Sequence, residues 1–352
     1  MDIYKNDDVI LDVRDLKVHF PIKKGMFRKT VGHVKAVDGV NFSIKEGETL
    51  GLVGESGCGK TTTGRSLIRL IEPTAGNVFY RDRNNITNIT DLSKNPMKNL
   101  RKDIQMIFQD PYSSLNPRMT VYELIAEPMR VYNIGNEKSR KEKAAELLES
   151  VGLSSSYLER YPNEFSGGQR QRIGIARALA LEPKVILCDE PVSALDVSVQ
   201  AQIINLLEDI QKELDLTFLF IAHDLSVIHH ISDRVAVMYL GKIVEMVDNK
   251  TLYSSPKHPY TEALLSAIPA PDPKRNPEHL ILEGDVPSPA NPPSGCNFHE
   301  RCKYAKDICK EKEPNLKAIK NDEEHLVACH FANELDLEPA VDQYRIKRNR
   351  MK

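Results

Sequence analysis

The sequence contains no tryptophan, and aromatic residues make up only 6% of its 352 positions. It has no apolar run near the roughly 20 residues that a membrane-spanning helix needs. The stretch over 217–222 is typical of its longer apolar segments. The first residues, 1–8, are polar and acidic, unlike a secretory signal. We therefore expect a cytoplasmic chain that meets a membrane only through a partner.

The sequence also lacks an excess of charge of either sign. Lys and Arg number 48 and Asp and Glu number 50, so the formal net charge is −2 at pH 7. This balance argues against a dedicated nucleic-acid binder, which usually carries a strong basic excess. The hydrophobic share of 41% and the charged share of 28% are typical of a globular protein. The length suggests two domains of ordinary size.

Short apolar segments alternate with amphipathic ones through about the first 255 residues. We expect strands over 48–53, 184–188 and 217–221, a helix over 61–70 and a terminal hairpin over 234–247. Apolar residues over 203–214 recur at helical spacing, which predicts a crossover helix. Strand, helix and strand in this order predict a mostly parallel sheet with helices on its faces. The segment 121–158 shows only helical patterns and predicts a helical insert.

Proline-rich and basic stretches lie outside the alternating strand and helix patterns. The stretches 269–273 and 286–293 are rich in proline and predict extended connectors. They precede a small module that holds four of the six cysteines. The tail over 345–352 is basic and predicts disorder. Basic residues over 23–35 predict a solvated loop, with contact to membrane lipid or a membrane protein as the alternative.

The segment over 54–61 fits the phosphate-binding pattern G-x-x-x-x-G-K-[ST] without a mismatch. It lies between a predicted strand and a predicted helix, which is the context that this pattern requires. Its glycines let successive N–H groups point at one anion. Lys60 is expected to reach the β- and γ-phosphates, and the Thr61 hydroxyl to bind Mg²⁺. The predicted nucleotide site comprises Gly54, Glu55, Ser56, Gly57, Cys58, Gly59, Lys60, Thr61 and Thr62.

A second predicted strand ends in two carboxylates, Asp189 and Glu190. Asp189 is expected to hold Mg²⁺ through water, while Glu190 points elsewhere and can polarise an attacking water. Alone, such a pair is usually a solvated strand end, but beside a phosphate loop it predicts a nucleoside triphosphatase. The segment 88–91 lacks the lysine of a guanine-reading motif, which favours ATP over GTP.

A third segment, Ser166-Gly167-Gly168-Gln169, stands at the expected start of a helix. It offers a hydroxyl and the N–H groups of a helix N-terminus, which together form an anion site. Since the chain already has a phosphate loop, a second anion site suggests ATP held between two chains. A plain helix cap is the alternative.

With these segments in this order, the sequence resembles the ATP-binding subunits of ABC transporters. Residues 54–61 resemble Walker A, 185–189 resemble Walker B, and 165–169 resemble the signature motif, with Phe165 where leucine is commonest. The resemblance implies an α/β fold of the P-loop NTPase class. This fold has a mostly parallel sheet, an antiparallel N-terminal subdomain, a helical insert at about 111–170 and a small C-terminal extension. The implied boundaries are 1–255 for the nucleotide-binding domain, 256–340 for the extension and 341–352 for the basic tail.

The resemblance also assigns roles to single residues. Glu190 is implied as the catalytic base, and Gln109 as the Q-loop residue that contacts Mg²⁺ and water and couples to the membrane subunits. His223 is implied as the switch histidine that contacts the γ-phosphate. Residues 193–196 resemble the D-loop, and Phe20 is our candidate for the aromatic residue that stacks on adenine.

Segments 109–120 and 189–200 resemble the oligopeptide/dipeptide importer subfamily, and 258–265 and 295–302 resemble its C-terminal extension, with the F-type subunit favoured. This resemblance implies a peripheral ATPase on the cytoplasmic face of the membrane, paired with a paralogous ATP-binding subunit. Its other partners would be two transmembrane permease subunits and, indirectly, an extracytoplasmic peptide-binding protein, with no nucleic acid. The alternatives are import of nickel or another small solute, and a soluble ABC ATPase that acts on nucleic acid.

Four cysteines cluster near the C-terminus. Cys296, Cys302, Cys309 and Cys329 are separated by five, six and nineteen residues, which matches neither common zinc sites nor the usual ferredoxin spacing. Scattered buried thiols are therefore one interpretation. Some relatives are implied to carry a [4Fe–4S] cluster on this extension, so we expect these four cysteines to bind one. Zinc, with His299 or His330 as a further ligand, is the second choice.

Overall fold

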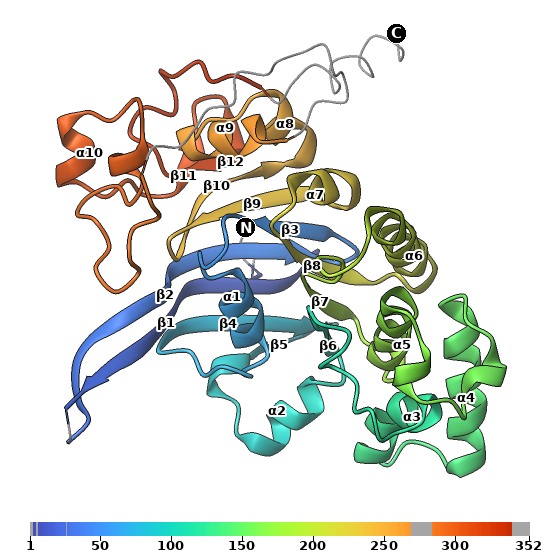
Figure 1. Cartoon of the computed structure of the whole chain (residues 1–352). Helices are drawn as coiled ribbons and strands as arrows, with labels where there is room; N and C mark the ends of the chain where they lie inside the picture. Colours follow the sequence, from blue (N-terminus) through green and yellow to red (C-terminus); the bar gives the residue numbers. More distant parts are fainter. Residues whose placement is uncertain (1–2, 5, 26, 269–283, 340–352) are drawn as a thin grey trace, which may run out of the picture. The chain divides into compact units, whose positions relative to one another are not determined.

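The computed structural model describes residues 3–4, 6–25, 27–268 and 284–339 (Figure 1). The chain divides into two compact units. The first contains Met1–Ser43, Leu50–Thr90 and His223–Lys352, and the second contains Ile44–Thr49 and Asp91–Ala222. Each unit therefore collects segments that are distant in sequence.

The first unit contains a four-stranded sheet ordered β2-β1-β4-β5. Its strands are β1 (Val9–Lys24), β2 (Lys29–Lys45), β4 (Ala75–Asp82) and β5 (Asn85–Asn88). β4 runs antiparallel to both β1 and β5, with Leu11 opposite Tyr80 and Arg81 opposite Ile86. This sheet confirms the antiparallel N-terminal part of the expected fold.

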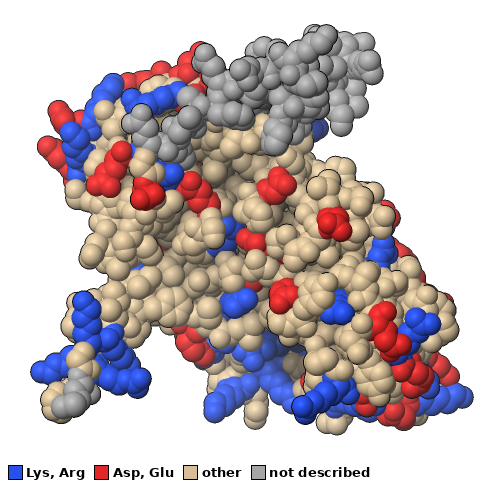
Figure 2. All heavy atoms as spheres, in the orientation of Figure 1, with Lys and Arg blue, Asp and Glu red and all other residues tan. Residues whose placement is uncertain are grey.

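The basic segment over 23–35 differs from the predicted loop. β1 and β2 extend into it as two long strands, so only a short turn at its tip stays outside them. Figure 2 shows Lys and Arg side chains gathered at the end of this hairpin. The burial pattern explains the error, because the outer halves of both strands are largely exposed and lack the apolar alternation that marks a strand.

The first unit also holds β3 (Thr49–Val53), β9 (Arg234–Tyr239), β10 (Lys242–Asp248), β11 (Lys317–Ile319) and β12 (Asp322–Val327). β3 lies parallel to β9, and β10 pairs antiparallel with β9 and β12. Every residue of β3 is buried. The predicted strand before the phosphate loop and the predicted hairpin are thus confirmed. The helix α1 (Lys60–Leu67) follows β3, and α7 (Leu225–Ile231) precedes β9.

In the second unit, β6 (Ile104–Ile107), β7 (Val185–Asp189) and β8 (Thr217–Ala222) lie side by side and parallel. All residues of β7 and β8 are buried. The helix α6 (Val197–Leu214) connects these two strands and buries Ile203, Ile204, Leu207 and Ile210. The strands and crossover helix predicted from apolar spacing are therefore confirmed.

The second unit also contains the predicted helical insert. Within its predicted bounds of about 111–170 lie α3 (Val121–Val131), α4 (Glu137–Ser150) and the short turns η2 (Ser155–Tyr157) and η3 (Pro162–Glu164). The helix α2 (Lys94–Leu100) precedes these bounds, and α5 (Gly167–Leu179) begins at their end. α3, α4 and α5 pack against one another (Figure 1). A capping box between Thr120 and Glu123 begins α3, and another between Asn136 and Ser139 begins α4.

The C-terminal extension packs against β9 and β10 of the first unit. It includes α9 (Pro259–Ser266), η4 (His299–Arg301), α10 (Asp307–Glu311), β11 and β12. The helix α8 (Asn249–Ser254) precedes the extension, and η1 (Ile89–Asp91) follows β5. Residues 286–293 have no helix or strand, as predicted for a connector. The predicted connector over 269–273 and the tail over 341–352 lie outside the described residues. Among the described helices, none combines the length and apolar character required to cross a membrane.

The iron–sulfur prediction is wrong. Among the described residues, no group of three or more His, Cys, Asp or Glu side chains could hold a metal ion. Cys296, Cys302, Cys309 and Cys329 are free thiols around a cavity of about 20 Å³, which has room for little more than one water. Burial raises the pKa of Cys296 to about 12 and that of Cys329 to about 11. Burial thus favours the neutral thiol at both positions.

The histidines considered for a zinc site are engaged elsewhere. His299 Nδ1 lies 2.9 Å from the Cys296 carbonyl oxygen, and His330 Nε2 lies 2.8 Å from the Lys312 carbonyl oxygen. The four cysteines are thus free thiols of a packed module, with Cys309 buried and the other three half-buried, which is close to the other interpretation of their spacing.

Candidate nucleotide site

The predicted phosphate loop leaves β3 and enters α1 in a conformation that requires glycine. Gly54 and Gly59 have φ values of 154° and 110°. A Cβ atom at Gly54 would collide with the Met238 carbonyl oxygen, and one at Gly59 with the Ala36 carbonyl oxygen. Since L side chains are disfavoured here on both counts, the spacing of glycines in the motif has a direct structural cause.

Lys60 begins α1 and points its ammonium group back into the loop. Its side chain is buried, and Nζ donates to the carbonyl oxygens of Gly54 at 2.7 Å and Glu55 at 3.0 Å. Thr61 and Thr62 follow in the first turn of the helix and are half-buried. Burial raises the pKa of the Cys58 thiol, so it adds no negative charge to the loop. The loop therefore offers a cation and a helix N-terminus, which fit a triphosphate.

Glu55 links this loop to the C-terminal extension. Its carboxylate accepts two hydrogen bonds from the Arg301 guanidinium, at 2.8 and 3.2 Å, and its N–H donates to the Tyr260 hydroxyl at 2.9 Å. Tyr260 and Arg301 lie in the segments that resemble the C-terminal extension, but that resemblance implied no role for either residue. No spacing rule could identify them, because they lie 205 and 246 positions from Glu55.

In the second unit, the acidic strand and the Q-loop residue come together. β6 and β7 are parallel neighbours, so the residues that follow them lie at the same sheet edge. Gln109 Nε2 donates to Glu190 Oε2 at 2.9 Å. Asp189 is fully buried at the end of β7, whereas Glu190 is half-buried. The two carboxylates thus occupy different environments, as expected for a metal-binding residue and a base.

Glu190 has a strained backbone. Its φ is 46°, a left-handed conformation that costs on the order of 1–3 kcal/mol for a residue other than glycine. Its N–H donates to the Ile221 carbonyl oxygen at 3.0 Å, which ties this turn to the end of β8. The turn gives Asp189 and Glu190 different directions, and such strain is typical of functional sites.

The segment over 166–169 begins α5 as predicted. Ser166 is its N-cap, and Gln169 completes a capping box: the Gln169 N–H donates to Ser166 Oγ at 3.4 Å, and the Ser166 N–H donates to Gln169 Oε1 at 3.0 Å. Ser166 is exposed, so the hydroxyl lies at the surface of the unit. Phe165 is buried and packs edge-on against Tyr157, which explains why a large apolar residue serves at this position.

The structure leaves the other two predicted residues accessible to solvent. His223 directly follows β8 and is exposed, and Phe20 in β1 is 40% exposed. The structure brings Gln109 to Glu190 and gathers the phosphate loop around Lys60. The roles predicted for His223 and Phe20 remain predictions.

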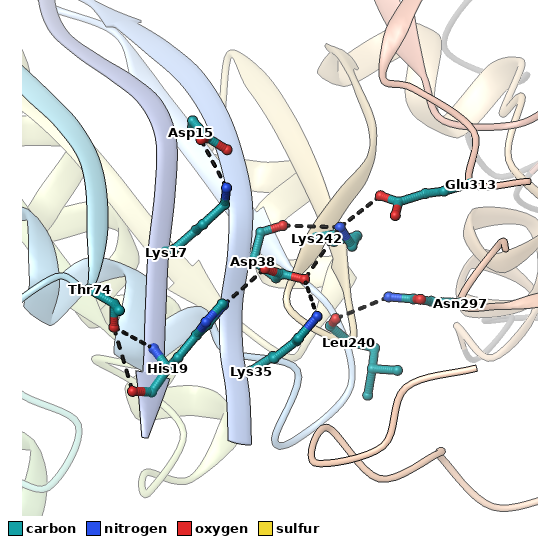
Figure 3. A network of polar contacts seen from close by, with 10 residues as sticks. All are labelled: Asp15, Lys17, His19, Lys35, Asp38, Thr74, Leu240, Lys242, Asn297 and Glu313. Carbon is teal, nitrogen blue, oxygen red and sulfur yellow. Dashed lines mark hydrogen bonds and ion pairs between the residues drawn. The ribbon is translucent and has the colours of Figure 1, made fainter. Parts of the chain in front are cut away.

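Polar contacts fix the strand that carries Phe20 (Figure 3). The neighbouring His19 has Nε2 2.9 Å from Asp38 Oδ1, and Asp38 also lies 3.5 Å from Lys35 Nζ and 3.6 Å from Lys242 Nζ. Lys242 in turn pairs with Glu313 of the extension at 2.7 Å. Burial opposes ionisation of Asp38, but Lys242, His19 and Lys35 together lower its pKa. An ionised Asp38 therefore links β1, β2 and β10.

Two family models match this chain. Residues 37–193 match the one described as ABC transporter, and residues 244–309 match the one described as oligopeptide/dipeptide transporter, C-terminal region. The second match covers α9 and η4, the elements that carry Tyr260 and Arg301.

Similar proteins cover nearly the whole chain. It is 56% identical over 329 residues to the oligopeptide transport ATP-binding protein AppF of Bacillus subtilis (strain 168), which spans 93% of this chain and 98% of that protein. It is 51% identical over 334 residues to the oligopeptide transport ATP-binding protein OppF of Haemophilus influenzae, spanning 94% and 99%.

A solved structure shows the same fold. The ATP-binding cassette MJ0796, as a dimer in a post-hydrolysis state with ADP and Pi, matches with a TM-score of 0.59 and 30% identity over 68% of this chain and 99% of that one. The predicted fold class is therefore confirmed. By the identity and coverage of these matches, the chain belongs to the family of ABC transporter ATP-binding subunits that carry the oligopeptide/dipeptide transporter C-terminal region.

Proposed function

We propose that this chain hydrolyses ATP to drive the import of oligopeptides or dipeptides through a membrane permease. The observation that carries this proposal is the joint match to an ABC transporter domain and an oligopeptide/dipeptide C-terminal region in one chain. Relatives with 51% and 56% identity are named for oligopeptide transport. The C-terminal match favours peptides over nickel or another small solute as the cargo.

The phosphate loop binds the triphosphate of ATP in this proposal. The N–H groups of Ser56 to Thr62 surround the phosphates, and Lys60 exchanges its two backbone carbonyl partners for β- and γ-phosphate oxygens. Thr61, Gln109 and Asp189 would hold Mg²⁺, which neutralises charge on the phosphates. The buried carboxylate of Asp189 and the hydroxyl of Thr61 are oxygen donors of the type that Mg²⁺ prefers. Phe20 stacks on adenine.

Glu190 acts as the base. Gln109 holds one oxygen of its carboxylate through the 2.9 Å hydrogen bond and contacts the attacking water. Glu190 accepts a proton from this water, whose oxygen attacks the γ-phosphorus in line with the bond to the leaving oxygen of ADP. The products are ADP and phosphate. Lys60 stabilises the developing charge, and His223 donates a hydrogen bond to the γ-phosphate.

A second subunit completes the site. The exposed Ser166 hydroxyl and the first N–H groups of α5 form an anion site that faces the triphosphate held by another chain. The exposed D-loop residue Asp196 lies at the start of α6 on the same unit. We propose a paralogous subunit as the partner. The pair binds two transmembrane permease subunits at the cytoplasmic face of the membrane, and an extracytoplasmic peptide-binding protein delivers the cargo.

Reconstitution of the assembled transporter in lipid vesicles tests this function. We expect the ATPase rate to rise when the binding protein is loaded with oligopeptide, and to stay at the basal level with Ni²⁺. The Lys60→Ala variant should bind ATP at least about 10-fold more weakly, because the principal cation of the loop is lost. Stimulation by Ni²⁺ but not by peptide would overturn the peptide assignment, and ATP affinity unchanged by Lys60→Ala would overturn the loop assignment.

A further inference from the structure

The C-terminal extension holds the phosphate loop by a salt bridge to its second residue. Arg301 and Glu55 make two hydrogen bonds at 2.8 and 3.2 Å, the fork geometry that gives the strongest pairing between guanidinium and carboxylate. Only 7% of the Arg301 side chain and 27% of the Glu55 side chain are exposed. Water therefore screens this pair less than it screens a surface pair.

Tyr260 holds the backbone of the same loop residue. Its hydroxyl accepts the Glu55 N–H at 2.9 Å. The ring is fully buried, 4.7 Å from the Tyr239 ring and 5.4 Å from the Phe298 ring between centroids. Because these aromatic rings confine Tyr260, its hydroxyl occupies a fixed point. The extension thus fixes both the main chain and the side chain of Glu55.

The other end of the loop is fixed through the β9–β10 turn. The Gly241 N–H donates to the Cys58 carbonyl oxygen at 2.9 Å. The extension contacts this turn as well, since Asn297 Nδ2 donates to the Leu240 carbonyl oxygen at 3.4 Å. The loop is therefore held at two separated points by groups that the extension supplies or contacts.

The charge of Glu55 gives the salt bridge a consequence for ATP binding. A carboxylate in the loop repels the negative phosphates of ATP unless a cation neutralises it. Lys60 contacts backbone carbonyl oxygens of the loop, whereas Arg301 contacts the Glu55 carboxylate directly. Arg301 thus removes an electrostatic penalty from a loop whose other groups attract anions.

We propose that Arg301 and Tyr260 are positioning residues for ATP binding, and that through Glu55 the C-terminal extension sets the ATP affinity of the phosphate loop. This inference rests on the proposed role of residues 54–61. It assigns the extension a function in the ATPase cycle in addition to its packing against β9 and β10.

Variants of the full-length chain test the charge argument. We expect Arg301→Ala to raise the Kd of ATP about 10-fold at low salt, an effect that shrinks at about 0.5 M salt because the repulsion is screened. In the reconstituted transporter the KM for ATP should rise equally, with kcat within about 2-fold, because Arg301 does not touch the reacting atoms. The double variant Glu55→Gln/Arg301→Ala should bind ATP within about 3-fold of the wild type, since no unpaired carboxylate remains.

Three further variants complete the design. Arg301→Lys keeps the charge but not the fork, and should lie between the wild type and Arg301→Ala. Tyr260→Phe keeps the buried ring and removes the hydroxyl, which should raise the Kd about 3-fold. Lys303→Ala is the control, because Lys303 belongs to the same segment but pairs with Glu262 and does not contact the loop. It should leave the Kd unchanged.

The outcomes separate this inference from the proposed function. If Lys60→Ala weakens ATP binding and Arg301→Ala does not, the loop assignment stands and the inference is overturned. If the double variant binds ATP as weakly as Arg301→Ala at every salt concentration, the effect comes from damaged packing, and the charge argument fails. If neither Lys60→Ala nor Arg301→Ala changes the affinity, the proposed loop function itself is wrong.

Discussion

Gln109 and Glu190 illustrate what single residues contribute to this site. A glutamine after one strand and a glutamate after its parallel neighbour meet within hydrogen-bonding distance. The left-handed backbone of Glu190 then separates its carboxylate from the buried one of Asp189. The different roles proposed for these two adjacent acidic residues, Mg²⁺ binding and proton acceptance, therefore depend on local backbone geometry.

Replacing the proposed base tests this division. We expect Glu190→Gln to lower the rate of ATP hydrolysis by about 10²-fold or more, because an amide cannot accept the proton of the attacking water. ATP binding should persist, since the phosphate loop and Lys60 are unchanged. The matched control is Glu208→Gln on α6, where the glutamate is half-buried, lies 3.9 Å from Lys212 and is outside the proposed site. A rate in Glu190→Gln equal to that of this control would exclude Glu190 as the base.

His258 predicts a pH-dependent stability. Burial lowers its pKa to about 4 from the ordinary 6.5, although Glu245 and a backbone hydrogen bond act in the opposite direction. The folded protein thus keeps this ring neutral, while the unfolded chain takes up a proton below pH 6.5. Stability is therefore lost as the pH falls from about 6.5 to about 4, by up to about 3 kcal/mol from this one group.

Unfolding by urea at several pH values measures this effect. His258 Nδ1 accepts the Tyr260 N–H at 3.1 Å and caps α9, so His258→Asn keeps an N-cap acceptor without a titrating group. The difference in unfolding free energy between wild type and variant should grow as the pH rises from 4 to 6.5 and then level off. A difference that is the same at every pH would contradict the assignment.

At the level of elements, buried strands and glycine turns were predictable from sequence, while exposed strands were not. β3, β7 and β8 are continuous apolar runs with every residue buried, so their pattern and their environment agree. The outer halves of β1 and β2 are exposed and basic, and backbone pairing forms them without an apolar signal. The local sequence pattern identifies a strand when burial selects apolar residues for it. The pattern gives no signal when backbone pairing forms the strand at the surface.

The same distinction applies to the site. The phosphate loop and the Asp189-Glu190 pair could be predicted from local spacing, because each proposed motif lies within a few consecutive residues. The Glu55–Arg301 pair joins positions 246 apart, and tertiary contacts such as the packing of Tyr260 against Phe298 accompany it. The iron–sulfur prediction failed for a related reason. Clustering of cysteines in the sequence does not specify the size of the cavity between them, which here is too small for an iron–sulfur cluster.

At the level of the whole molecule, the proposed function assigns two incomplete anion sites to each chain. The phosphate loop belongs to the first unit, and the exposed Ser166 at the start of α5 belongs to the second. The same unit exposes large apolar residues, with Val197 82% and Tyr112 56% exposed. Such residues are commonly covered when subunits associate. The arrangement is consistent with ATP hydrolysis by a pair of chains.

Dependence on a second chain gives the last prediction. We expect the ATPase rate per chain to rise with the chain concentration or on addition of the paralogous subunit, because a lone chain supplies only one side of the site. Ser166→Arg should lower the maximal rate by about 10²-fold while the chain still binds ATP on its own loop, since the bulky cation obstructs only the partner's phosphates. Ser156→Arg, at an exposed serine of η2, controls for the added charge. A strictly monomeric preparation that hydrolyses ATP at the full rate, insensitive to Ser166→Arg, would show that one chain is sufficient.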